Sequence, residues 1–303
     1  MPLQIARFGW PWLAYLAVGF ALPASAQVIP DTTLGAESSD VLLNGITVNG
    51  TTADLVRGGA QRQGNLFHSF EQFSIGAGQR IYFDNPVGVG RIFNRVTGAQ
   101  CSNIFGTLGV NGGADLFLLN PNGIVFGPDA RLDLQGSFAA STADAIEFGA
   151  LGSYGTEGAG VPGSLLTVSP SAFLFGGVEV PGEIVVESVA DEVGLKVANG
   201  ESLVLLGSDV TVDGGRLTAY EGRVEVGALV GAGTVGLGTD GQLTFVEGLE
   251  RGDVVFENGA LVNVQLADNG DIGVTARNID VKNSALLAGI LGENSTAESQ
   301  AGD

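Results

Sequence analysis

The amino-acid sequence predicts an all-β fold, and within that class it favours a β-solenoid, in which short strands coil around one core. Glycine accounts for 49 of 303 residues, hydrophobic residues make up 45%, and charged residues make up only 15%. This composition is typical of short apolar strands joined by tight turns. In the later half, apolar runs recur with Leu203, Val224, Leu243 and Val262 at intervals of 21, 19 and 19 residues. A period near twenty predicts coils that stack upon one another.

An antiparallel sandwich would also place strands at regular intervals, and the strand pattern alone leaves that alternative open. Such a sandwich needs hairpin signals, which are few. The best are Asp213-Gly214-Gly215 and Asp240-Gly241, and each suits a solenoid corner equally well. If the chain after residue 26 is a solenoid, about 20–25 residues per coil predict roughly 11–14 coils, or fewer if a cap lies outside the helix.

The first 26 residues are predicted to be a secretory signal peptide. Arg7 is their only charged residue, residues 10–22 form an apolar run, and Ala24-Ser25-Ala26 is an A-x-A cleavage site. Cleavage there predicts a mature chain that begins at Gln27, and the alternative is a retained N-terminal anchor. Without Arg7 the chain has 12 basic and 33 acidic residues, a net charge of −21. This charge excludes nucleic acid as an electrostatically attracted partner.

Strands are predicted along the whole mature chain, without a Pro- or Ser-rich linker that would divide it. The apolar runs are residues 41–43, 46–48, 80–83, 91–96, 116–119, 123–126, 131–134, 184–186, 203–206, 224–226, 243–245, 261–264 and 274–276. Phe67, Phe70 and Phe73 are spaced three apart, which suits a single helical or 3₁₀ turn and a kinked strand equally well.

A tight turn is predicted where Asn120-Pro121-Asn122-Gly123 separates two of these strands. Asn in the first position, Pro in the second and Gly in the fourth suit a type I turn. Pro121 fixes its own φ and biases Asn120 towards an extended conformation. The chain therefore turns sharply and enters the next strand at Ile124.

No catalytic or metal-binding constellation is evident in the sequence. His68 is the only histidine and lies between Phe67 and Phe70, so a structural role is predicted and a conventional zinc site is excluded on ligand count. Cys101 is the only cysteine, which excludes an intramolecular disulfide and predicts a small, buried apolar side chain. No Walker loop, EF-hand loop or nucleophile elbow occurs. We therefore expect no catalytic residue, no cofactor and no metal.

Carboxylates near one another in the sequence support an alternative, because β-solenoids can carry polysaccharide-cleaving enzymes. Asp133, Asp144 and Glu147 are the candidates, and Lys196 and Lys282 are the only lysines. A groove that gathers carboxylates with a nearby Arg or Lys would favour a carbohydrate-active enzyme. An exposed, uncapped terminal coil would favour a third reading, a self-assembling surface structural protein.

Several sequence blocks occur in an order that is specific to one family. They are NLFHSFEQF at residues 65–73, SNIFGTL at 102–108, GADLFLL at 113–119, NPNGIVFG at 120–127 and GSFAAS at 136–141. The stretch from residue 43 to 149 resembles the secretion domain of the filamentous haemagglutinin family, found on exoproteins of two-partner secretion. Residues 166–176 and the later coils resemble continuations seen in cyanobacterial members. The sequence departs from the family pattern in lacking an upstream Asn-Pro-Asn-Leu motif and in having Cys101 where a turn-forming Pro is expected.

The resemblance implies a right-handed parallel β-helix with an N-terminal cap and small extra-helical elements. It also implies export through an outer-membrane β-barrel transporter, whose periplasmic domains recognise this region while it is unfolded or extended. The expected secretion motif is Asn120, Pro121, Asn122, Gly123 and Ile124. The expected organisation is a signal peptide at residues 1–26, the secretion domain with its cap at 27–150, and further coils with a polar tail at 151–303.

The resulting expectation is a non-enzymatic, adhesin-like exoprotein of a Gram-negative cell. Its route passes through the periplasm and the outer membrane, and it is then released or held at the cell surface. Besides the transporter, the expected partner is a carbohydrate or protein on a host or cell surface.

Overall fold

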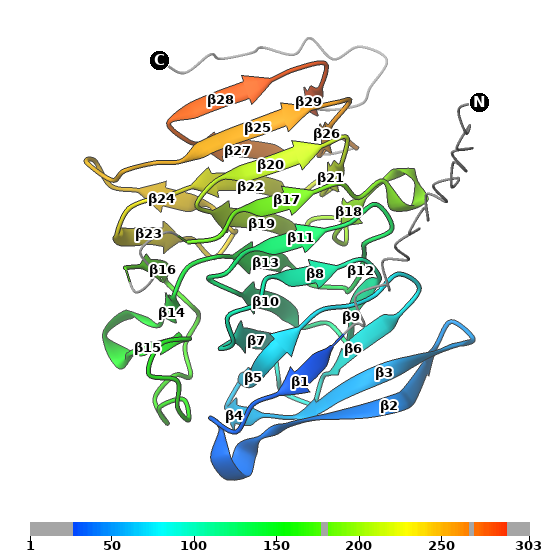
Figure 1. Ribbon diagram of the computed structural model, residues 1–303, viewed down its shortest axis with the longest axis vertical. Helices are drawn as coiled ribbons and strands as arrows, with labels where there is room; N and C mark the ends of the chain where they lie inside the picture. Colours follow the sequence, from blue (N-terminus) through cyan, green and yellow to red (C-terminus); the bar gives the residue numbers. More distant parts are fainter. Residues whose placement is uncertain (1–26, 177–180, 267–269, 290–303) are drawn as a thin grey trace, which may run out of the picture.

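The computed structural model describes residues 27–176, 181–266 and 270–289. Short strands wind along one axis into a β-helix, so the predicted all-β class and β-solenoid architecture are confirmed (Figure 1). The predicted signal peptide, with Ala24 and Ala26, and the polar tail from residue 290 lie outside the described residues. Within the described ranges, no helix is long and apolar enough to cross a membrane.

The longest sheet forms one face of the β-helix. Seven of its nine strands are parallel, because β1 and β4 pair with β5 in the antiparallel sense. The parallel strands stack in the order β5 (Asn65–Phe73), β7 (Arg91–Val96), β10 (Asp115–Leu119), β13 (Phe138–Ser141), β19 (Ser202–Gly207), β22 (Arg223–Ala228) and β27 (Asp271–Thr275).

A second face consists of six parallel strands. They are β8 (Ser102–Ile104), β11 (Ile124–Phe126), β17 (Ile184–Val186), β20 (Val210–Asp213), β25 (Asp253–Glu257) and β28 (Asn278–Val281).

The third face is divided into two sheets. The lower sheet contains β2 (Ser39–Val48), β3 (Thr51–Gly58), β6 (Arg80–Asp84), β9 (Thr107–Asn111) and β12 (Arg131–Asp133). The upper sheet contains β18 (Leu195–Lys196), β21 (Arg216–Thr218), β26 (Leu261–Asn263) and β29 (Ala285–Leu287).

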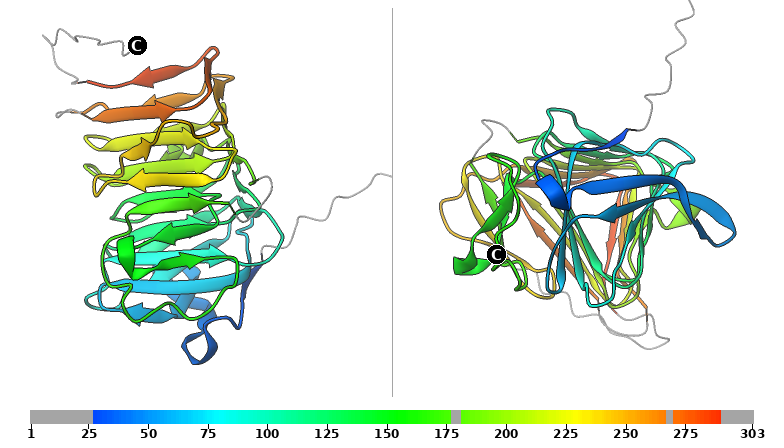
Figure 2. Two further views of the ribbon diagram at one scale, coloured as in Figure 1. Left: turned by 90° about the vertical axis from the view of Figure 1, so that its left-hand side faces the viewer. Right: turned by 90° about the horizontal axis from the view of Figure 1, so that it is seen from below.

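Antiparallel elements cap the β-helix and flank it, so the sheets are mixed. β1 (Val28–Pro30) and β4 (Ala60–Arg62) lie against β5, and the β2–β3 hairpin closes the lower end. A separate sheet beside the helix contains β14 (Ala145–Glu147), β15 (Ser153–Gly155), β16 (Ala172–Phe175), β23 (Gly233–Leu237) and β24 (Leu243–Phe245) (Figure 2). Three 3₁₀ turns complete the described elements: η1 (Gly35–Glu37), η2 (Gly149–Leu151) and η3 (Ala190–Glu192).

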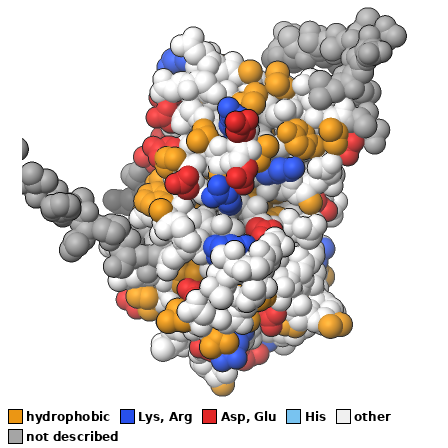
Figure 3. Space-filling model, turned by 90° about the vertical axis from the view of Figure 1, so that its right-hand side faces the viewer, with side chains coloured by type: hydrophobic (Ala, Val, Ile, Leu, Met, Phe, Trp, Pro, Cys, Tyr) orange, Lys and Arg blue, Asp and Glu red, His pale blue; other side chains and the backbone are white. Residues whose placement is uncertain are grey.

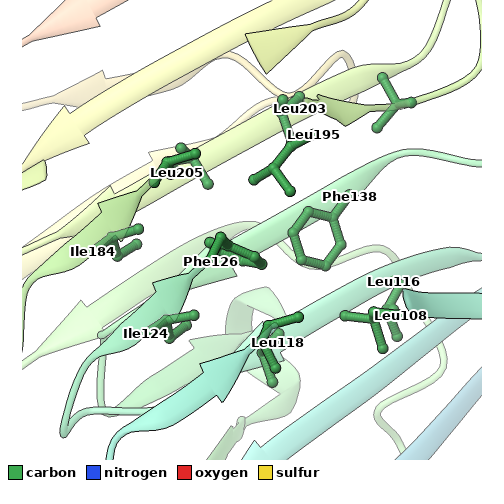
Figure 4. Packing of buried hydrophobic residues seen from close by; sticks show 14 of the residues in the cluster. Leu108, Leu116, Leu118, Ile124, Phe126, Phe138, Ile184, Leu195, Leu203 and Leu205 are labelled. Carbon is green, nitrogen blue, oxygen red and sulfur yellow. The ribbon is translucent and has the colours of Figure 1, made fainter. Parts of the chain in front are cut away.

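The interior is apolar because every second side chain of a strand points inward. The long sheet contributes a stack that includes Leu116, Phe138 and Leu203, which meet Phe126 and Ile184 of the second face (Figure 4). The outward side chains of the long sheet, such as Phe93 and Phe117, are covered by the separate antiparallel sheet and form a second core with it. The long sheet is therefore buried on both faces, which explains its nearly continuous apolar sequence.

The period predicted from the later half is only partly correct. Leu203 and Val224 are partners in neighbouring coils, but the next partner of Val224 is Ile272. Leu243 belongs to the flanking sheet and Val262 to the third face. The excursion at residues 229–252, which contains the hairpin β23–β24, is about one coil long and therefore imitates a period of nineteen.

The number of coils in the described residues lies below 11–14, the direction expected when a cap lies outside the helix. Seven parallel strands stack in the long sheet, fewer than the 11–14 coils predicted, because cap and flanking strands consume sequence without adding a coil. Asp240-Gly241 joins the antiparallel strands β23 and β24 as a hairpin. Asp213-Gly214-Gly215 is a solenoid corner between β20 and β21.

The phenylalanine-rich segment is a strand, not a helical turn. Residues 65–73 form β5, so the kinked-strand alternative is correct. Phe67 faces the outer core, whereas Phe70 and Phe73 both face the interior. Two inward residues three apart require a break in the alternation, and the register between β1 and β5 shifts at Pro30, opposite Phe70.

Candidate functional site

The predicted turn joins β10 to β11 at a corner of the β-helix. Its closing hydrogen bond runs from the Gly123 N–H to the Asn120 carbonyl oxygen over 3.1 Å. The Asn122 N–H also donates to the Asn120 side-chain oxygen over 3.0 Å, which adds an Asx turn within the same corner. Gly123 has φ +108°, a conformation that side chains disfavour, so glycine suits this position.

Asn120 is fully buried and connects the turn to the neighbouring coils. Its Nδ2 donates to the Gln100 carbonyl oxygen over 3.0 Å and to Ser102 Oγ over 2.9 Å, both in the coil below. Its backbone N–H donates to the Ser141 carbonyl oxygen over 3.0 Å, at the end of β13. In the folded protein the Asn120 side chain therefore connects neighbouring coils and is inaccessible to a partner.

Asn122, two residues later, is exposed on the surface. Its Nδ2 donates to the Gly98 carbonyl oxygen over 2.8 Å and lies 3.2 Å from the Asn120 side-chain oxygen. Among the five predicted motif residues, Asn122 is the one whose side chain the folded protein presents to solvent, since Asn120, Pro121, Gly123 and Ile124 are buried.

The segment at Gly182 and Glu183 covers the turn from above. The Gly182 N–H donates to the Pro121 carbonyl oxygen over 2.6 Å, and the Ile124 N–H donates to the Glu183 carbonyl oxygen over 3.1 Å. A side chain at position 182 would overlap the backbone of residues 122 and 123, so the two segments pack backbone against backbone. The turn is thus enclosed by a segment some sixty residues later in the chain.

Cys101 lies beside this corner, but it is half-buried, so the prediction of a buried apolar thiol is wrong in degree. Burial and the nearby Glu183 carboxylate raise the pKa of the Cys101 thiol. A raised pKa keeps the sulfur protonated and unreactive. The cysteine that replaces the expected proline therefore acts as packing next to Gly123.

His68 is fully buried in the interior, as its predicted structural role requires. Its Nδ1 lies 3.0 Å from Ser39 Oγ, and its ring lies 5.2 Å from that of Phe83. Burial lowers the pKa of His68 from 6.5 to about 3, because the charged ring would lose its hydration. His68 is therefore neutral at ordinary pH and joins the cap hairpin to the first coil.

The three candidate carboxylates do not form one cluster. Asp133 lies on β12 of the third face, whereas Glu147 lies on β14 of the flanking sheet and Asp144 just before it. In the described part of the chain, no group of three or more His, Cys, Asp and Glu side chains is placed to hold a metal ion.

A buried polar network near the start of the mature chain was not predicted from the sequence. Asp31 accepts hydrogen bonds of 2.6 Å from Ser69 Oγ and from Thr97 Oγ1. Burial alone would raise the pKa of Asp31, but these bonds and those from Thr33 hold it below its ordinary value. The network ties the segment after β1 to two coils of the helix.

Arg95, near the end of β7, completes this network. Its side chain is only 2% exposed, donates to Ser69 Oγ over 2.9 Å, and lies with its guanidinium carbon 4.2 Å from the centroid of the Tyr154 ring. It also donates to the carbonyl oxygens of Gly155 and Gly160 over 2.8 Å each. The one signal in the sequence was an arginine inside an apolar strand, but its partners lie far away along the chain.

Gln27, the expected first residue of the mature chain, accepts a hydrogen bond of 2.9 Å at its carbonyl oxygen from the Ser74 N–H. The next residues form β1, which pairs with β5. The predicted mature start therefore lies directly beside the first coil.

Comparison with known proteins gives a family match and a fold match. A sequence model of the TPS secretion domain family matches residues 26–274. The heme/hemopexin-binding protein of Haemophilus influenzae strain Rd is 36% identical over 75 residues, which are 25% of this chain and 8% of that protein. A second Haemophilus influenzae protein with this name is 31% identical over 98 residues, covering 32% of this chain and 10% of that protein.

The solved HMW1 secretion domain from Haemophilus influenzae is similar in fold. The TM-score is 0.55 at 21% identity, over 84% of this chain and 66% of that one. The match to the two heme/hemopexin-binding proteins covers about a tenth of their length or less.

Proposed function

This chain belongs to the family of TPS secretion domains, the export domains of two-partner secretion exoproteins, and we propose that its Asn120–Ile124 turn is recognised by the partner transporter before the turn folds. As a family member, the chain crosses the outer membrane and is secreted or held at the cell surface. Family membership also implies the partner, an outer-membrane β-barrel transporter.

The burial of the turn supports recognition of the unfolded chain. Asn120 and Ile124 have no exposed surface in the folded protein. A transporter domain can reach these side chains only while the segment at Gly182 and Glu183 has not yet closed over them. An extended chain also offers free backbone groups, which a partner can bind by adding a strand.

The rest of the proposal concerns organisation and role. Residues 27–150 carry the recognition region and the cap, and the coils continue after the flanking strands β14, β15 and β16. The exoprotein is adhesin-like and non-enzymatic, with a carbohydrate or protein of another surface as its target. The buried, neutral His68 and the placement of Asp133 on a different sheet from Asp144 and Glu147 support a non-enzymatic role.

A binding experiment with isolated periplasmic domains of the transporter tests the central step. A synthetic peptide of residues 98–127 should bind these domains, and an equally long peptide of residues 199–228 from later coils serves as the control. The folded chain should not compete with the 98–127 peptide, because its turn is enclosed. Equal binding of the two peptides, or full competition by the folded protein, would contradict the proposal.

A further inference from the structure

The third face of the β-helix is interrupted between β12 and β18. In the described structure β12 pairs with β9 below and β18 pairs with β21 above, but β12 and β18 do not pair with each other. Between these strands the chain leaves the helix to form β14, β15 and β16, and it re-enters at β17. A groove of about 720 Å³ opens at the interruption, within the range of about 300–1,000 Å³ that is usual for small-molecule sites.

Charged and apolar side chains both line the groove. Arg80, Arg131 and Lys196 line it together with Asp133 and Asp191. Figure 3 shows basic and acidic side chains interspersed on the side of the molecule where β12 and β18 lie in Figure 1. These five groups carry a net charge of +1, in a chain whose formal net charge is −20.

A chain of hydrogen bonds fixes the position of Asp133 at the groove. Arg80 Nη2 donates to the Tyr82 hydroxyl over 2.6 Å, and this hydroxyl donates to Asp133 Oδ2 over 2.5 Å. Burial, together with the Asp133 carboxylate, raises the pKa of Tyr82, so the phenol stays protonated and keeps donating. Asp133 is thereby fixed as an acceptor at the groove.

An ion pair between two residues that line the groove joins β12 to the corner at Asp191. Arg131 donates from Nε and Nη2 to the two carboxylate oxygens of Asp191 over 2.9 and 3.2 Å. Asp191 and the following Glu192 have φ +49° and +61°, which is uncommon for residues other than glycine. Strain of this kind is found where a site must be held in one shape.

Lys196 has no carboxylate partner within ion-pair distance among the described residues. Its ammonium nitrogen lies 5.1 Å from the centroid of the Tyr220 ring. The other lysine, Lys282, is paired with Asp280 at 2.9 Å. Arg131 is neutralised by Asp191 and Arg80 lies 3.8 Å from Asp133, so the unneutralised charge of the groove is that of Lys196.

We propose that this groove binds a short acidic oligosaccharide, with a sugar carboxylate on Lys196 and sugar hydroxyls on the fixed carboxylates and guanidinium groups beside it. The hydroxyl groups of a sugar ring both donate and accept hydrogen bonds. Carboxylates beside guanidinium groups offer acceptors and donors side by side, which suits such a ring. A long polyanion is disfavoured by the negative charge of the rest of the chain. The site belongs to the folded exoprotein outside the cell and does not depend on how the transporter recognises the unfolded chain.

Titration calorimetry on the purified, secreted protein tests the proposal. Tetragalacturonate should bind saturably, and its fully methyl-esterified form, which lacks the carboxylate charges, should bind at least tenfold more weakly. Lys196→Gln should abolish the difference between the two sugars. Lys282→Gln removes the same charge from the chain at a distant position and should leave the binding unchanged.

A second variant guards against loss of structure at Lys196. Asn199 lines the groove and is exposed, so Asn199→Asp adds a negative charge without removing a buried contact. It should weaken binding of tetragalacturonate while the midpoint of unfolding stays that of the parent. Absence of binding at 10 mM sugar, equal binding of acid and ester, or equal effects of Lys196→Gln and Lys282→Gln would overturn the proposal.

Discussion

Asn120 and Asn122 are joined by a hydrogen bond of 3.0 Å from the Asn122 N–H to the Asn120 side-chain oxygen, yet one side chain is fully buried and the other is exposed. The two asparagines of this turn therefore have different roles. The buried residue holds neighbouring coils together, and the exposed residue is available at the surface. This division makes the structural and recognition roles separable by mutation.

Asn120→Ala should destabilise the folded protein by about 2–4 kcal/mol. The change removes the bonds to the Gln100 carbonyl oxygen and to Ser102 Oγ and leaves buried groups unpaired. Asn122→Ala should cost about 1 kcal/mol or less, because water replaces the lost bond. Urea unfolding of purified proteins measures both, and equal losses would show that burial does not distinguish the two residues.

If the transporter binds the Asn122 side chain, Asn122→Ala should strongly lower the secreted fraction while the free energy of unfolding changes by about 1 kcal/mol or less. Asn278→Ala is the control, since Asn278 is also exposed and its side chain also donates a hydrogen bond, to Asp253 over 2.9 Å. The secreted fraction is measured in cells that contain the partner transporter. Equal secretion of both variants and the parent would remove Asn122 from the recognition site.

Gly182→Ala should destabilise the protein by about 1–3 kcal/mol, because the added methyl group overlaps the backbone of the turn. Gly113→Ala is the control, since a methyl group at position 113 meets no atom within 4 Å. The control should change the free energy of unfolding by less than about 0.5 kcal/mol. Similar values for the two variants would mean that residues 182 and 123 are not closely packed in solution.

Folding stability should fall as the pH is lowered from about 6.5 to about 3, in part because of His68. Its pKa is about 3 in the folded protein and 6.5 ordinarily, so in this window the unfolded chain binds one more proton. The contribution to the slope is up to about 1.4 kcal/mol per pH unit. His68→Asn can retain the contact with Ser39 but cannot titrate.

The difference between the two proteins isolates the histidine, because all carboxylates are common to both. Urea unfolding at several pH values should give a shallower pH dependence for His68→Asn than for the parent. Parallel curves would show that the imidazole is hydrated in the folded state.

Local features were predictable from the sequence, and features that depend on distant segments were not. The Asn120–Gly123 turn and the stacking of Leu203 on Val224 follow from dihedral preferences and strand period. The enclosure of the turn by Gly182 was not predictable, because the chain first forms the flanking sheet. Leu243 was misplaced because the excursion at residues 229–252 is about one coil long and keeps the apolar spacing.

The candidate sites show the same limit. The contacts of Arg95 with Asp31 through Ser69, and of Asp133 with Arg80 through Tyr82, join residues from different coils. Which residues pair depends on which strands become neighbours in the fold. The spacing of apolar residues in the sequence does not reveal the inserted segments that decide this. An arginine in an apolar strand can be noticed, but its partners cannot be named.

The Arg95 network joins segments that lie far apart in the chain, which has a consequence for folding during export. The network forms only when the segment after β1, the first two coils and the loop that contains Gly160 are all on one side of the membrane. Whichever end of the chain leads, the network cannot close until residues 31 and 160 are on the same side of the outer membrane. The hydrogen bonds that Arg95 makes in the folded protein can therefore all form only after both residues have crossed.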